Sequence, residues 1–322
     1  MFVAQGGDYP HPDAIFVRIT LIHNPGAGDD DQPGGEELSA LMRRHGHSVR
    51  YQSGKDKTWT AVLDEPADLF VVAGGDGTVG RVAKKVIGRD LRLAPLPLGT
   101  ANNISKTLGV TELTLDEIVD GWAHAKVLSF DAGVATGPWG SRYFMEAFGV
   151  GLFARTLPVA DRSKTLRQLN DADEKVRTAV KMLRDRLHDC PHHRLDLKLD
   201  GQHLSGDYVL FEAMNMEFVG PNLYLAPDMD PDDGMLDVVL VTAAERDALE
   251  EPLDNWKEGE DHVPDLPRIR ASNVELEWTG YPVHIDDEAW PPEGEKVEAA
   301  PKTEIELNVE HDAVKFVAPS AA

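Results

Sequence analysis

The sequence is poor in several features that would each define a class of protein. Its single cysteine, Cys190, excludes an internal disulfide, and a lone thiol without a recognisable catalytic pattern is more often buried than nucleophilic. No apolar run approaches the roughly 18 residues of a membrane-spanning helix, and the N-terminus lacks the pattern of a signal peptide. We therefore expect a cytoplasmic protein.

Basic residues are also scarce, since 32 Lys and Arg stand against 56 Asp and Glu and give a net charge of −24. Such a charge repels nucleic acid and anionic bilayers at long range, so we expect no nucleic-acid partner. Residues 162–186 depart from this trend, with eight basic and four acidic residues. The segment is either a solvated helix with an apolar stripe on the core or a peripheral contact with an anionic membrane.

At 322 residues the chain is longer than a usual single core, which favours two domains around a cleft. Residues 1–14 are predicted to be a flexible tail. From residue 15, an apolar strand, a glycine-containing loop and an amphipathic helix recur three times up to residue 125. This alternation predicts an α/β domain over 15–125, with a parallel sheet that binds ligands beyond the carboxyl ends of its strands.

The pattern then changes to longer strand-like runs with hairpin signals, such as Asp200-Gly201. These runs predict a second, mainly β domain over 126–313. One helical segment, 164–187, is inserted in it and carries an apolar stripe at helical spacing.

The strongest local signal is VVAGGDGTV at residues 71–79, a strand that runs into glycines just before a helix. Its glycines let backbone N–H groups approach a phosphate, the Thr78 hydroxyl adds a donor, and the helix N-terminus is partially positive. Asp76 would act through Mg²⁺ or position the phosphates. The same residues also fit a tight turn capped by Asp76 and Thr78.

Two further loops follow neighbouring strands. PLPLGTANN at 95–103 repeats the design one unit later, and HNPGAG at 23–28 follows the first strand. Thr100, Asn102 and Asn24 would therefore emerge on one edge of the sheet and complete a phosphate cradle. The same sequences also fit turns that are capped by asparagine and bind no ligand.

An acidic turn, PDMDPDDGMLDVVLV at residues 227–241, places Asp230, Asp232 and Asp233 before a strand. Carboxylates this close repel one another and suit either a hard cation such as Mg²⁺ or a solvated Asp-Gly turn.

A second acidic run, PVHIDDEAW at residues 282–290, ends a strand in Asp286, Asp287 and Glu288. One of these carboxylates could accept a hydroxyl proton late in phosphoryl transfer, and a solvated acidic hairpin is the alternative.

Five motifs occur in the order found in the diacylglycerol kinase catalytic-domain family, which includes bacterial lipid kinases and sphingosine and ceramide kinases. They are GGDGTV, PLGTANN, FGVGLFA, EAMNMEFVGPNLYLAPDMDPDDGMLDVVLV and HIDDE. The chain resembles this family over about residues 17–318. The resemblance implies an α/β domain joined by the C-terminal segment 314–322, a β-sandwich domain, and transfer of the γ-phosphate of ATP to a lipid hydroxyl.

The resemblance and the loops together also give a set of site residues. The expected ATP contacts are Asn24, Ser53, Gly74, Gly75, Asp76, Gly77, Thr78, Val79, Thr100 and Asn102. The resemblance implies Glu288 as general base with Asp286 in support, and a structural Mg²⁺ held by Asp230, Asp233 and the Met235 carbonyl.

The chain departs from the family pattern at three places. Asn103 stands where many members have Asp, Asp287 replaces a glycine, and Gly80-Arg81 replaces a frequent Asn-Glu pair. These changes bear on metal affinity and turnover.

The acceptor stays open between diacylglycerol-like, phosphatidylglycerol-like and sphingoid lipids, and the resemblance makes a homodimer plausible. Two other functions also stay open. One is a kinase of a soluble metabolite such as NAD, because NAD kinases share the GGDGT loop, and the other is a non-catalytic nucleotide-binding protein.

Overall fold

The structure, a computed structural model, describes residues 17–29, 31–254, 265–292, 295, 297 and 303–319. The predicted tail 1–14 and the last three residues of the segment 314–322 lie outside this part. Within the described residues, no helix is both long and apolar enough to cross a membrane.

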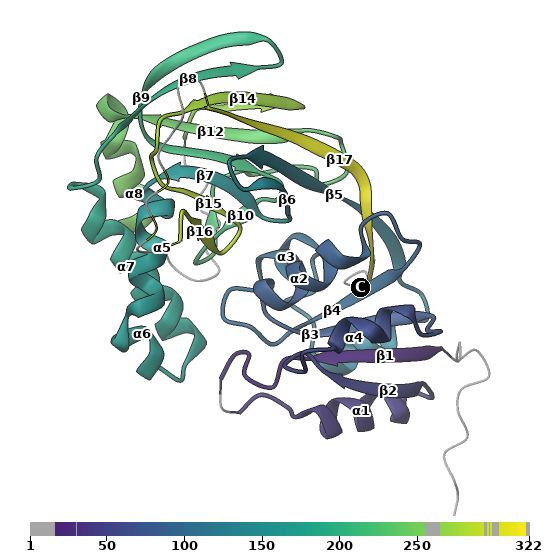
Figure 1. Ribbon diagram of the computed structural model, residues 1–322. Helices are drawn as coiled ribbons and strands as arrows, with labels where there is room; N and C mark the ends of the chain where they lie inside the picture. The colour runs from purple at the N-terminus through teal and green to yellow at the C-terminus, as the bar shows by residue number, and fades with distance from the viewer. Residues whose placement is uncertain are drawn as a thin grey trace, which may run out of the picture.

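The first lobe is a parallel sheet with strand order β2-β1-β3-β4, and helices cover it (Figure 1). Its strands are β1 (Arg18–His23), β2 (Ser48–Ser53), β3 (Leu69–Gly74) and β4 (Arg92–Pro97). Its helices are α1 (Gly35–Arg44), η1 (Trp59–Asp64), α2 (Asp76–Val86), α3 (Asn103–Thr107) and α4 (Leu115–Gly121).

Local sequence explains the central unit of this lobe. β3 is buried at every position, as expected for a parallel strand covered on both faces. α2 then begins at Asp76, and the carbonyl of its N-cap Gly75 accepts hydrogen bonds from the N–H groups of Thr78 and Val79. The helix buries Val79, Val82, Ala83 and Val86, which share one face at helical spacing.

The second lobe is an antiparallel, sandwich-like set of strands. Its strands are β6 (Gly140–Phe144), β7 (Ala147–Gly151), β8 (His193–Leu199), β9 (Gln202–Met214), β10 (Phe218–Val219), β11 (Leu223–Tyr224), β12 (Leu236–Thr242), β13 (Arg268–Ala271), β14 (Asn273–Trp278), β15 (Val283–Ile285) and β16 (Glu288–Trp290). η2 (Ala243–Leu249) and α8 (Glu250–Asp254) follow β12.

Two long strands belong to both lobes. β5 (Lys126–Gly137) pairs antiparallel with β17 (Thr303–Ala318), and β17 also pairs with β14 at one end and with β4 at the other. Phe130 and Phe316 meet edge to face between them, with ring centroids 5.5 Å apart. The last described strand of the chain therefore joins the first lobe to the second.

Three helices project from the second lobe beside the first-lobe loops (Figure 1): α5 (Leu152–Arg162), α6 (Lys164–Gln168) and α7 (Ala172–Leu187). The single helix predicted over 164–187 is thus two helices. The break has a local cause, because Asp171 caps α7 by accepting a hydrogen bond of 2.8 Å from the Glu174 N–H. α7 buries Val176, Val180, Leu183 and Leu187.

Candidate active site

The three predicted loops meet at the carboxyl edge of the parallel sheet. The Asn24 N–H donates to the Ala73 carbonyl at 2.9 Å, and the Leu98 N–H donates to the Gly74 carbonyl at 3.2 Å. A Cβ on Gly75 would lie 2.9 Å from the Cα of Gly99, so any larger residue would push these two loops apart. The loops therefore form one packed edge lined with backbone groups.

Side chains from the loops mainly fix the shape of that edge. Asn24 Nδ2 donates to Thr78 Oγ1 at 3.1 Å. Asn102, in a left-handed conformation, accepts from the Gly99 N–H through Oδ1 and donates to the Gly99 carbonyl through Nδ2. These two asparagines hold the loops in place.

The side chains of two other expected ATP contacts also interact with the rest of the protein. Val79 is buried in the first-lobe core, so its side chain does not face the loops. Ser53 ends β2, and its hydroxyl accepts a 3.3 Å hydrogen bond from the Lys55 N–H.

The second lobe closes on α2 through Asp286. Its carboxylate forms an ion pair with Lys84 Nζ at 2.8 Å and accepts hydrogen bonds from the N–H groups of Met145 and Glu146. Asp286 itself has φ 51°, whereas Asp287 has no left-handed conformation. Replacement of the family's glycine by Asp287 therefore adds a charge without straining the backbone.

Four carboxylates converge between the lobes around a void of about 30 Å³, which Asp76, Glu146, Asp286 and Asp287 line together with Lys84. Burial raises the pKa of Asp76, although the Ile104 N–H donates to its Oδ1 at 2.9 Å. Burial, with repulsion from Asp76 and Asp286, raises the pKa of Glu146 well above its usual value. Burial between the lobes therefore favours the protonated forms of Asp76 and Glu146.

Glu288, the predicted base, lies in a more open environment. Its side chain is 69% exposed and forms an ion pair of 3.2 Å with Arg142. It lines a cavity of about 460 Å³ together with Gly77 of α2 and Asp287. The predicted base therefore faces the beginning of the glycine-loop helix from the second lobe.

Glu146 is a site residue that the sequence analysis missed. Its Oε1 accepts hydrogen bonds from the Gly220 N–H at 2.5 Å and from Asn103 Nδ2 at 3.3 Å. Asn103 is buried and also donates to the Gly220 carbonyl at 2.9 Å. The opposite lobe thus places an acidic side chain beside Asn103. The sequence feature that could have identified Glu146 is its position as the one acid within the otherwise apolar run FMEAFGVG.

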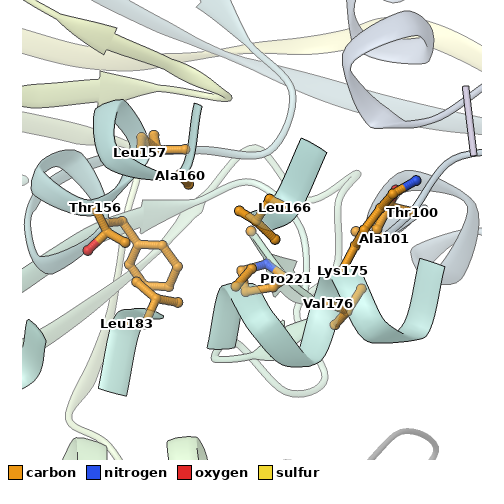
Figure 2. Close-up of a pocket in the computed structure, with 13 residues that line it drawn as sticks. Thr100, Ala101, Thr156, Leu157, Ala160, Leu166, Lys175, Val176, Leu183 and Pro221 are labelled. Carbon is orange, nitrogen blue, oxygen red and sulfur yellow. The ribbon is translucent and has the colours of Figure 1, made fainter. Parts of the chain in front are cut away.

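An apolar cavity of about 330 Å³ opens beside the loop between β4 and α3 (Figure 2). Its walls come from α5, α6 and α7, with Leu157, Leu166 and Val176 among the lining side chains. Thr100 and Ala101 of the loop between β4 and α3 also line it. An elongated apolar ligand in this cavity would end next to the loops.

In the acidic turn before β12, the predicted metal-binding carboxylates contact other groups of the protein. Asp233 accepts a hydrogen bond from the Met235 N–H and forms an ion pair with Arg270, so both of its oxygens are engaged. Asp230 accepts from the Asp232 N–H. Both carboxylates thus have partners within the protein, and a structural Mg²⁺ held by Asp230, Asp233 and the Met235 carbonyl stays a prediction.

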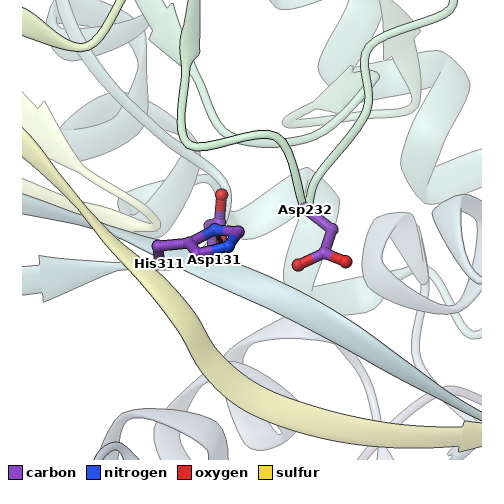
Figure 3. Close-up of side chains that lie close together, drawn as sticks. All are labelled: Asp131, Asp232 and His311. Atoms are coloured by element: carbon purple, nitrogen blue, oxygen red, sulfur yellow. Dashed lines mark hydrogen bonds and ion pairs between the residues drawn. The ribbon is translucent and has the colours of Figure 1, made fainter.

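Among the described residues, one group of side chains of the kinds that bind metals lies close together: Asp131, Asp232 and His311. Their possible ligand atoms lie within 4.8 Å of one another (Figure 3). Asp131 is buried and accepts hydrogen bonds from His311 Nδ1 at 2.9 Å and from the Gly234 N–H at 2.7 Å. Asp131 thereby ties the acidic turn to β5 and β17.

Glycine loops at the edge of a parallel sheet, faced by a carboxylate-bearing β lobe, define a two-lobed phosphotransferase. The family model for the diacylglycerol kinase catalytic domain matches residues 18–135. The model for the YegS C-terminal NAD kinase beta sandwich-like domain matches residues 159–308. The chain belongs to the diacylglycerol kinase catalytic-domain family, which confirms the predicted fold class and resemblance.

Individual relatives agree with this assignment. A diacylglycerol kinase of Mycobacterium tuberculosis is 26% identical over 75% of this chain and 77% of its own length. One from Bacillus subtilis is 28% identical over 70% of this chain and 74% of its own. A crystal structure titled as a diacylglycerol kinase of Bacillus anthracis, 18% identical, superposes with TM-score 0.63 over 94% of this chain and 96% of that one, which supports the fold.

Replacing Asn103 with aspartate is expected to destabilise the protein by about 1–3 kcal/mol at neutral to alkaline pH. The change removes the Nδ2 donor and places a second acid beside Glu146. Burial and repulsion would raise the pKa of the new carboxyl in the folded state, so its charge penalty is absent below the unfolded pKa of about 4 and grows as pH rises towards the folded pKa. Urea unfolding at about pH 5 and about pH 8 measures the difference.

The matched control is Asn103→Ser, which removes the amide without adding a charge and should lose the same stability at both pH values. If Asn103→Asp and Asn103→Ser were equally destabilised at the higher pH, Glu146 would not be the carboxylate that faces residue 103.

Proposed function

We propose that this protein transfers the γ-phosphate of ATP to the hydroxyl group of a lipid. The observation that carries the proposal is the position of the apolar cavity against the loop between β4 and α3, because Thr100 and Ala101 belong to both. An acyl or alkyl chain in the cavity would leave its polar end beside the loops, where the phosphates of ATP would lie. The acceptor class stays open between diacylglycerol-like, phosphatidylglycerol-like and sphingoid lipids.

In this proposal the first lobe binds ATP and the second lobe supplies the proton acceptor. The loop edge around Gly74, Gly75 and Gly77 presents backbone donors to the phosphates, with the Thr78 hydroxyl beside them. Mg²⁺, when bound with ATP, screens the phosphate charge. Asp76 positions the loops by holding the Ile104 N–H.

Glu288 acts as general base, and Asp286 holds the hairpin that carries it. The acceptor oxygen forms a bond to the γ-phosphorus as the bond from phosphorus to the ADP oxygen breaks, and the hydroxyl proton passes to Glu288. Arg142, which forms an ion pair with Glu288, orients the carboxylate.

The apolar cavity also bears on the two other functions. A kinase of a soluble metabolite such as NAD has no need of a cavity with this lining, and a non-catalytic nucleotide-binding protein has no need of an acceptor site. We further propose that the protein is cytoplasmic and works at the membrane surface, in contact through residues 162–186. A homodimer remains compatible with the fold.

Wild-type protein is expected to transfer labelled γ-phosphate from Mg-ATP to a component of a total lipid extract in mixed micelles. Glu288→Gln should lower the transfer about 100-fold or more, because glutamine cannot accept the proton. Glu304→Gln, an exposed acid on β17, is the matched control and should keep full activity. Labelling of NAD or sugars without lipid would favour the soluble-metabolite kinase, and ATP binding without any transfer would favour the non-catalytic protein.

Filling the apolar cavity should affect the lipid alone. Ala179 lines the cavity from α7, so Ala179→Trp is expected to raise the KM for the lipid about 10-fold or more while the KM for ATP stays unchanged. Steady-state kinetics with each substrate varied in turn measure the two constants. An unchanged KM for the lipid would place the acceptor outside this cavity.

Membrane contact through residues 162–186 can be tested by charge reversal at Arg177, Lys181 and Arg184, which are exposed on α7. Each basic residue near an anionic surface contributes roughly 1 kcal/mol, so the triple change to glutamate should weaken vesicle binding about 100-fold or more. Co-sedimentation with vesicles containing anionic phospholipid measures this, with neutral vesicles as control. If the triple variant bound these vesicles as well as the wild-type protein does, the basic face of the helix would be a solvated surface and not a membrane contact.

A further inference from the structure

Arg81 lies where three cavities meet. It lines the small void beside Asp76, the cavity that contains Glu288, and a third cavity of about 320 Å³ beside Asn24 and Lys55. The third cavity follows the carboxyl ends of β1 and β2, and the other two contain the acids of the second lobe. Arg81 is thus placed between the nucleotide side of the site and the acceptor side.

The helix geometry directs this side chain towards the glycine loop. Arg81 is four residues after Gly77 on α2, and positions four apart share a helix face. Because helical side chains lean towards the N-terminus of their helix, Arg81 leans towards the loop that begins α2.

Two contacts hold the guanidinium in place. It stacks over the buried Trp59 ring at 5.2 Å, and its Nη2 donates to the Gly54 carbonyl at 3.1 Å. A guanidinium carries several more N–H donors in a rigid fork that matches phosphate oxygens. Arg81 is therefore a pre-positioned cation with donors left for a ligand.

The electrostatics of the site call for such a cation. The second lobe contributes Glu146, Asp286 and Asp287, and the transferring phosphoryl group is itself negative. Two of the cations that line these cavities are already engaged by acids, Lys84 by Asp286 and Arg142 by Glu288. Lys55, Lys57 and Lys85 line one cavity each, whereas Arg81 lines all three.

We propose that Arg81 contacts the γ-phosphate of ATP and stabilises its charge during transfer. This inference rests on the proposed function and names a residue of that same site. The Gly80-Arg81 departure from the family's Asn-Glu pattern then places a cation where relatives have an acid.

The test compares the binding of Mg-ATP and Mg-ADP by calorimetry, which needs no lipid acceptor. Arg81→Ala is expected to weaken ATP binding about 10- to 100-fold, the range for a charged hydrogen bond, and to change ADP binding by less than about 3-fold. Arg81→Lys keeps the charge and should recover part of the loss. Arg92→Ala, an exposed arginine on β4 away from the three cavities, is the control and should change neither.

Equal weakening of ATP and ADP would mean that Arg81 only supports Trp59 and the loop after β2, and would overturn the inference. Unchanged ATP binding in a folded Arg81→Ala protein would overturn it too. A third outcome separates the two proposals. If Arg81→Ala selectively lost affinity for ATP but the wild-type protein labelled no lipid, the role of Arg81 would stand and the lipid acceptor would be rejected. The two proposals can therefore fail separately.

Discussion

The ion pair between Asp286 and Lys84 is the contact on which the geometry of the site depends. It joins a second-lobe hairpin to α2, directly after the glycine loop, and the same carboxylate anchors the corner between β6 and β7. Burial lowers the pKa of Lys84, but attraction to Asp286 and the neighbouring acids outweighs this effect and raises it, so the ammonium stays charged. In a chain of net charge −24, this cation allows several carboxylates to gather beside the glycine loop that begins α2.

The two lobes are less independent than separate domains on a linker. β5 and β17 run through both and pair with each other along most of their length, with an irregularity between Glu310 and Val314. Any opening of the site must therefore bend a paired ribbon, which favours small changes of angle over a free swing. The β ribbon therefore limits how far the two lobes can move apart, which would suit a reaction that depends on positioning.

Sequence patterns predicted the parts of the fold and site that depend on near neighbours. Continuous apolar runs such as 69–72 predicted buried parallel strands, and the glycines after them predicted the loop edge, because both signals lie within a few residues. Glu146 and Arg81 escaped prediction because their roles come from contacts with Asn103 and Trp59 across long stretches of chain. Local periodicity holds no information on such pairings. The helix break near Asp171 was missed because the apolar stripe continues through it.

The pairing of Asn103 with Glu146 has a consequence for how such a site can change over generations. One position supplies an amide and the other a carboxylate, and the two lie on opposite lobes. An aspartate at position 103 beside Glu146 would add repulsion, whereas loss of Glu146 beside Asn103 would leave the amide without its acid. Either single substitution would therefore give a less stable intermediate protein. Positions 103 and 146 should consequently change together in evolution or both stay unchanged.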